Sequence, residues 1–230
     1  MPDERPPTIA DIRRKALLPL QAWWDVFVIE PVAICLAWLL VRLWPGLTPN
    51  AVTGLSLLVA VAAACLFWTG AYLWAALAYQ LYYVLDNLDG ILARLTDRTS
   101  TLGGRLDGLT NILAYGLNVA GLFLGMAGNA AAAQVGALLL VVFILHLGIG
   151  RVLDKPEAAT WANVVPPQSA VLRRHRLLYP LSFPDRHAIL FLFGPLSGFA
   201  VAAGLFILAV ELASLLAKTR RMFLGAGRPS

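Results

Sequence analysis

Charged side chains are scarce in this sequence. Asp, Glu, Lys and Arg make up 13% of the 230 residues, whereas hydrophobic residues make up 59%. A soluble domain carries about a quarter charged residues, so this composition argues against a water-soluble protein. The apolar residues also occur in long runs, such as 55–67 and 135–147, that contain almost no polar side chain. Runs of this kind are typical of helices that lie in a lipid bilayer.

Cysteine is almost missing as well. The sequence has only 2 cysteines, Cys35 and Cys65, and both lie in apolar stretches. This number and spacing exclude a disulfide framework and a zinc site built from paired cysteines. We expect both to be small buried hydrophobic side chains. Because the first 24 residues are polar and contain proline, we also expect no cleavable signal peptide.

The apolar segments predict an all-α integral membrane protein. Residues 1–47 are predicted to form a polar tail and an interfacial amphipathic helix, 48–218 a six-helix membrane domain, and 219–230 a C-terminal tail. Membrane helices are predicted at about 50–68, 72–94, 104–126 and 130–150, and 187–217 is predicted to form a hairpin that turns near Pro195. Residues 25–44 either cross the membrane or lie on its surface, because several polar residues and a proline interrupt them.

The basic residues predict the topology. If 25–44 lies on the surface, the N-terminal tail, the 95–103 loop, the 151–186 loop and the C-terminus all face one side. Basic loops mark the cytoplasmic side, so we favour a multi-pass protein of the cell's inner membrane with this side in the cytoplasm. If 25–44 spans and 187–217 crosses once, the orientation reverses. In either orientation, the basic residues that give the net charge of +5 flank apolar segments and fit contact with anionic headgroups. We therefore expect no nucleic-acid partner.

The most informative stretch lies around the 95–103 loop. On a helix, positions 86, 89, 90 and 93 share one face, and positions 103, 107 and 111 share one face of the next helix. The short loop predicts that these helices are antiparallel neighbours. The side chains of Asp86, Asp89 and Asp107 are therefore expected to converge near the membrane surface.

Three converging carboxylates repel one another unless a cation lies among them. Oxygen ligands suit Mg²⁺ or Mn²⁺, so these residues predict a divalent metal site. The alternative is that an aspartate pairs with Arg94 or Arg105 and that the nearby small residues only allow close helix packing. Each feature alone favours this alternative, but together their exact spacing, described next, favours the metal site. A transporter built on intramembrane carboxylates is a further, less favoured interpretation.

The spacing matches a family signature, D-x2-D-G-x2-A-R-x8-G-x3-D-x3-D. The matching residues are Asp86, Asp89, Gly90, Ala93, Arg94, Gly103 and Asp107. On these residues the sequence resembles the CDP-alcohol phosphotransferases, also called CDP-alcohol phosphatidyltransferases. The last signature position, an aspartate in the family, is Asn111 here.

The resemblance implies a dimeric membrane enzyme of phospholipid synthesis with its site open to the cytoplasm. Such an enzyme moves a substituted phosphate from a CDP-alcohol, for example CDP-diacylglycerol, to an acceptor alcohol and releases CMP. Asp86, Asp89, Asp107 and Asn111 would bind two Mg²⁺ or Mn²⁺ ions, and Asp107 and Asn111 occupy catalytic positions. Gly90, Ala93, Arg94 and Gly103 would line the CDP pocket.

Asn111 departs from the signature where the family has its general base. Its amide can still ligate a metal through oxygen, but it is neutral and accepts no proton, so the second ion should bind less tightly. Three interpretations stay open: a natural variant with another base, a nucleotide- and metal-binding protein with impaired catalysis, or an Asp-to-Asn variant that traps its substrate.

Outside the signature, the acceptor site is predicted from residues near the same side of the membrane. His146, Arg151 and Arg186 are the candidates. A packing role for His146 and lipid contacts for the two arginines are the alternatives, and His146 is also the first candidate for a substitute base. Glu211 lies inside the last apolar stretch and needs a partner, which the sequence does not identify.

Overall fold

The computed structural model describes residues 6–126, 128–153, 172, 174–178 and 181–225. These residues form helices and no strand, with one isolated parallel bridge between Gln21 and Leu177. The predicted all-α class is therefore confirmed. Within the described chain, 4 helices are long and apolar enough to cross a membrane: Asp25–Leu43, Pro49–Trp68, Ala130–Gly148 and Ala200–Ala217.

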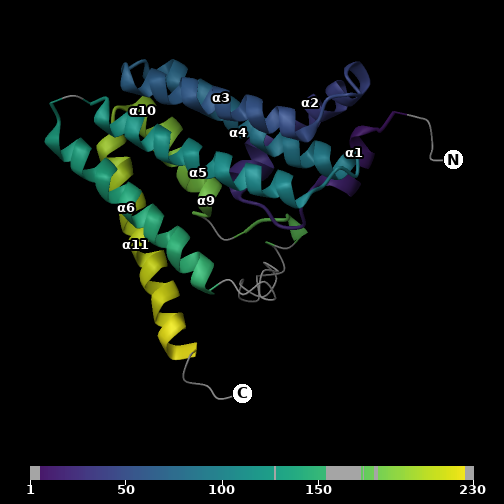
Figure 1. The fold of residues 1–230 in the computed structure, drawn as a ribbon. Helices are drawn as coiled ribbons and strands as arrows, with labels where there is room; N and C mark the ends of the chain where they lie inside the picture. The colour runs from purple at the N-terminus through teal and green to yellow at the C-terminus, as the bar shows by residue number, and fades with distance from the viewer. Residues whose placement is uncertain (1–5, 127, 154–171, 173, 179–180, 226–230) are drawn as a thin grey trace.

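Three long helices pack together: α3 (Pro49–Trp68), α4 (Tyr72–Leu95) and α5 (Thr101–Leu124), with α3 along the upper edge of the view in Figure 1. The side chain of Thr48 caps the start of α3, and that of Ser100 caps α5. Helix α3 packs along both α4 and α5, whereas few backbone positions of α4 and α5 approach each other. The backbones of the two signature helices are thus held side by side mainly through α3, and their direct contacts with each other are made by side chains.

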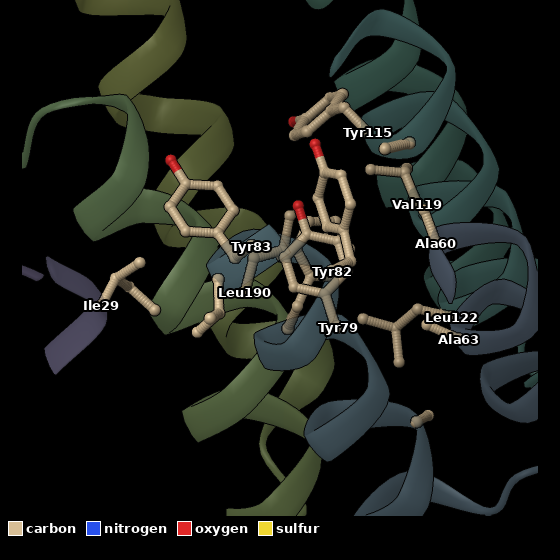
Figure 2. Packing of buried hydrophobic residues seen from close by; sticks show 14 of the residues in the cluster. Ile29, Ala60, Ala63, Tyr79, Tyr82, Tyr83, Tyr115, Val119, Leu122 and Leu190 are labelled. Atoms are coloured by element: carbon tan, nitrogen blue, oxygen red, sulfur yellow. The ribbon is translucent and has the colours of Figure 1, made fainter. Parts of the chain in front are cut away.

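Glycine allows α3 and α5 to pack closely. A Cβ atom at Gly121 would lie only 2.3 Å from the backbone oxygen of Ala64, so no larger residue fits at this crossing. Side chains from α3, α4, α5 and the 189–193 segment fill the core next to it (Figure 2). The largest fully buried rings include Tyr79, Tyr82 and Phe67.

The second half of the chain forms a less central layer. Helix α6 (Ala130–Leu153) packs against α5 and against α11 (Ala200–Gly225), and Figure 1 shows α6 and α11 side by side. Between α6 and α11 in the sequence, three short segments follow one another without a break: α9 (Phe183–Ala188), the π-helical η3 (Ile189–Phe193) and α10 (Gly194–Ser197). The chain then turns at Gly198, which has a φ of 78°, close to the turn predicted at Pro195.

The N-terminal segment lies along α4. It comprises α1 (Ile9–Ala16), a π-helical turn η1 (Asp25–Ile29) and α2 (Glu30–Leu43). The indole N–H of Trp24 donates to the Gln80 side chain at 3.0 Å, and both α1 and α2 pack against α4. Since η1 and α2 together are long and apolar enough to span, the predicted interfacial position of this segment is not confirmed, and neither is the count of six spans.

The two cysteines are exposed, which corrects the expectation that they are buried. Large apolar side chains such as Leu58 and Ile144 are also exposed, at 68% and 64%. In a membrane protein the outer helix faces meet lipid rather than water. An apolar stretch therefore does not indicate which of its side chains are in the protein core.

Candidate active site

Asp89 lies where α4 meets α3. Its carboxylate accepts a hydrogen bond from the hydroxyl of Thr53, and only 5% of the residue is exposed. The same hydroxyl lies 3.2 Å from the carbonyl oxygen of Pro49 in the first turn of α3. Thr53 was not predicted from the sequence, because nothing in an apolar helix shows which neighbour its hydroxyl meets. Helix α3 therefore contributes a polar contact to the site as well as packing.

Asp86 and Asp107 come together from α4 and α5. A side-chain hydrogen bond joins them. Oδ1 of Asp86 is buried and has no hydrogen-bond partner among the described residues. Asp107 also accepts a hydrogen bond from the amide nitrogen of Asn111 at 3.1 Å. The structure thus places these signature side chains together, as their helical spacing predicts.

The donor set fits a divalent cation. Two carboxylates in contact repel each other unless a proton or a cation lies between them, and the buried Oδ1 of Asp86 needs a partner. In the described part of the chain, no group of three or more His, Cys, Asp or Glu side chains is arranged to hold a metal ion. Metal binding by Asp86, Asp89 and Asp107 stays a prediction.

The small residues of the signature lie at the same ends of α4 and α5. A Cβ atom at Gly90 would lie 3.1 Å from the guanidinium of Arg94, and one at Gly103 would lie 3.2 Å from the side-chain oxygen of Asn50. Arg94 also donates a hydrogen bond to the backbone oxygen of Ala16. Ala93 is partly exposed beside them. Gly90 therefore leaves space that the Arg94 side chain occupies.

Asn111 uses both ends of its amide. Its nitrogen donates to Asp107, as above, and its oxygen accepts a hydrogen bond of 2.6 Å from the hydroxyl of Tyr82. We did not predict Tyr82 from the sequence, although its position one turn before Asp86 places it on the same face of α4. The side chain at the family's base position is thus hydrogen-bonded to both signature helices.

A second polar cluster surrounds Glu211, whose residue is 6% exposed. Its carboxylate lies 2.9 Å from Nδ1 of His146 and 3.2 Å from the guanidinium of Arg186. These are two of the three predicted acceptor residues, and they supply the partners that Glu211 needs. The side chain of Arg151 lies outside the described residues. Sequence spacing could not reveal this cluster, because its members lie on α6, α9 and α11.

Aromatic residues connect the two clusters. Tyr115 follows Asn111 by one turn of α5 and lies close enough to Glu211 and Arg186 to interact electrostatically. Its ring stacks on His187 with centroids 5.1 Å apart. The hydroxyl of Tyr79 lies 2.9 Å from Nδ1 of the same histidine. The Glu211 cluster and the carboxylates are therefore neighbours across a layer of rings.

Basic segments meet at the end of α4 near the carboxylates. Lys15 donates to the side chain of Asp97 at 2.6 Å and to the backbone oxygen of Leu95 at 3.0 Å. Arg176 forms two hydrogen bonds of 3.0 Å with the carboxylate of Glu30 and also bonds to the backbone oxygen of Leu18. The tail, the loop after α4 and the described part of the 151–186 loop therefore lie together.

Comparison with known proteins identifies the same stretch of chain. A model of the CDP-alcohol phosphatidyltransferase family matches residues 46–217. No curated protein matches the chain significantly.

Solved structures of phosphatidylinositol phosphate synthase from Mycobacterium tuberculosis share the fold. The form with CDP-DAG bound is 22% identical with a TM-score of 0.59 and covers 83% of this chain and 92% of that one. The form with manganese and citrate is 22% identical with a TM-score of 0.61, and the match covers 86% of this chain and 93% of that one. The apo form is 21% identical, also with a TM-score of 0.61, and the match covers 85% of this chain and 100% of that one.

Proposed function

Because the chain belongs to the CDP-alcohol phosphatidyltransferase family, we propose that it transfers a substituted phosphate from a CDP-alcohol to an acceptor alcohol and releases CMP. The observation that carries this proposal is the contact between Asp86 and Asp107 from two helices, with Asp89 one turn along α4. Carboxylates are costly at membrane depth, and in this family they serve the pyrophosphate of the donor.

The proposed donor is CDP-diacylglycerol or a related CDP-linked lipid. A solved neighbour carries CDP-DAG, which supports this choice. Gly90, Ala93, Arg94 and Gly103 would line the CDP pocket at the ends of α4 and α5. Arg94 is well placed to bind a phosphate, because its guanidinium lies over Gly90. A phosphate of the nucleotide would replace the Ala16 carbonyl oxygen as hydrogen-bond acceptor of this guanidinium.

The proposed cofactor is Mg²⁺ or Mn²⁺, held by Asp86, Asp89 and Asp107 with Asn111 as a fourth, neutral oxygen donor. A neighbour was solved with manganese, and the oxygen donors of this chain suit the same ions. When bound, such ions stabilise the charge that develops on the phosphate oxygens. Of the two proposed ions, the one next to Asn111 binds more weakly, because one negative charge is missing.

The proposed acceptor site lies around Glu211. In the reaction, the acceptor oxygen forms a bond to phosphorus, the bond to CMP breaks, and the acceptor proton must go to a base. Asn111 cannot accept it, whereas the ring of His146, whose Nδ1 lies 2.9 Å from the Glu211 carboxylate, has a second nitrogen that could accept it. Arg186, and Arg151 near the end of α6, would bind an acidic group on the acceptor.

One observation favours a second candidate function, a nucleotide- and metal-binding protein that turns over poorly. The amide of Asn111 is held by Tyr82 and Asp107, so the family's base position is filled by a well-ordered neutral group. Loss of a general base costs about 10²–10⁴ in rate. Binding of donor without CMP release would identify this second function.

The proposed topology places the carboxylates on the cytoplasmic side of the inner membrane. It has six spans, with residues 25–44 beside α4 rather than across the bilayer. The contacts of Lys15 with Asp97 and of Arg176 with Leu18 support it, because they bring the predicted basic segments to one side. We further propose a homodimer, as the family resemblance implies.

The test is CMP release by the purified protein with CDP-diacylglycerol, Mg²⁺ or Mn²⁺ and a pooled set of acceptor alcohols. Metal-dependent release establishes the transferase. Metal-dependent donor binding without release supports the binding protein instead. A protein that neither binds the donor nor releases CMP contradicts both functions.

A further inference from the structure

Tyr82 makes a direct tie between the two helices that carry the signature. It lies one turn before Asp86 on α4, and its hydroxyl donates to Oδ1 of Asn111 on α5 at 2.6 Å. Few backbone positions of α4 and α5 approach each other. A side-chain bond across this gap therefore affects how the carboxylates on the two helices face each other.

The partners of Asn111 fix which way its amide points. An ionised Asp107 can only accept hydrogen bonds, so the amide must turn its nitrogen toward that carboxylate, 3.1 Å away. This leaves the amide oxygen facing Tyr82, whose hydroxyl must then be the donor. The three residues form a directed chain of hydrogen bonds that runs from Tyr82 through Asn111 to Asp107.

The ring of Tyr82 is held rigidly. The residue is 1% exposed, and its ring centroid lies 5.3 Å from that of Tyr79 and 6.0 Å from that of Tyr83 (Figure 2). A buried ring in this packing has little freedom to move its hydroxyl. The donor that orients Asn111 is therefore in place before any ligand binds.

We propose that Tyr82 is a positioning residue for the metal and donor site. Its hydroxyl sets the amide of Asn111, and the amide nitrogen holds the carboxylate of Asp107 against Asp86. The role rests on the proposed function, since it concerns the same carboxylates. In this role Asn111 contributes the hydrogen bonds of its amide, which an aliphatic side chain could not supply, although Asn111 cannot serve as a base.

The test is a double-mutant cycle on Mn²⁺ binding and on Mn²⁺-dependent binding of CDP-diacylglycerol to the full-length protein in detergent. Tyr82→Phe keeps the ring and removes only the hydroxyl. We expect it to weaken Mn²⁺ binding by about 3- to 10-fold, the usual value of one hydrogen bond. In an Asn111→Ala background, Tyr82→Phe should have no further effect, because the chain of bonds is already broken.

Tyr83→Phe is the matched control. It removes a hydroxyl from the neighbouring ring, which is outside the chain of bonds, and should leave Mn²⁺ binding unchanged. Independent effects of Tyr82→Phe and Asn111→Ala, equal losses in Tyr82→Phe and Tyr83→Phe, or no Mn²⁺ binding by the parent protein would each overturn the proposal. Coupled losses in Mn²⁺ binding without any CMP release would support the role of Tyr82 and contradict the transferase instead.

Discussion

Glu211 on α11 lies 2.9 Å from Nδ1 of His146 on α6. The same carboxylate also lies 3.2 Å from Arg186, and the side chains of His146, Arg186 and Glu211 are 12%, 14% and 8% exposed. One buried carboxylate thus joins three helices of the second half of the chain. Tyr115, one turn after Asn111 on α5, lies close enough to Glu211 and Arg186 to interact with them, so the cluster is near the proposed site.

Loss of this carboxylate should destabilise the protein. Glu211→Ala leaves Arg186 buried without its counter-charge, which costs about 3–5 kcal/mol for a buried pair. The measurement is the thermal unfolding midpoint in detergent. Leu212→Ala, at a residue on the same helix that is 41% exposed, is the control and should change the midpoint much less. An unchanged midpoint in Glu211→Ala would show that the ion pair does not support the fold.

Removal of the Thr53 hydroxyl should weaken the site without unfolding the protein. Thr53→Val keeps the shape of the side chain but takes away the donor to Asp89. A hydrogen bond to a charged group contributes about 1.5–3 kcal/mol, so we expect at least a tenfold loss in metal-dependent donor binding. Thr69→Val, whose hydroxyl donates to the Leu66 backbone oxygen at the far end of α3, should bind normally. Equal binding by both variants would exclude a role for Thr53.

An aspartate at position 111 should raise turnover. In Asn111→Asp, Tyr82 can still donate to the side chain, and the new carboxylate supplies a base and a charged metal ligand. The expected gain in CMP release is about 10²-fold or more, with a stronger dependence on Mg²⁺ or Mn²⁺. Equal or lower release by the variant would mean that Asn111 is not a disabled base, and would direct attention to His146.

The close crossing of α3 and α5 should not accept a side chain. Gly121→Ala places a Cβ atom against the Ala64 backbone and should cost about 1–3 kcal/mol by overpacking. Gly116→Ala on the same helix is the control, because no atom lies within 4 Å of its added Cβ, and alanine favours helix. A Gly121→Ala protein as stable as Gly116→Ala would contradict the packing described for α3 and α5.

Local spacing allowed much of the site to be predicted. Residues 86 and 89 share a helix face, as do 107 and 111, and the structure brings Asp86, Asp107 and Asn111 into contact. Long apolar runs likewise predicted the all-α class and most helix bounds to within a few residues. Both predictions depend only on the regular geometry of a helix over a few turns, which follows from residue spacing in the sequence.

Contacts between distant segments could not be predicted in the same way. Thr53, Tyr82 and the partners of Glu211 each contact a residue on another helix, and the pattern within one helix does not specify which side chains of another helix it meets. The exposure of Cys35 and Cys65 was mispredicted for a related reason. Lipid accepts apolar side chains as readily as the core does, so hydrophobicity does not separate the inner from the outer face.

Binding of CDP-diacylglycerol with and without Mn²⁺ tests the central claim most directly. It should be compared in the parent protein, in Asp86→Asn and in Asp97→Asn, an aspartate in the loop after α4 whose side chain is 79% exposed. The account predicts metal-dependent binding by the parent and by Asp97→Asn, and little binding by Asp86→Asn. Binding that is independent of Mn²⁺, or equal in Asp86→Asn and the parent, would contradict a metal-dependent site at these carboxylates.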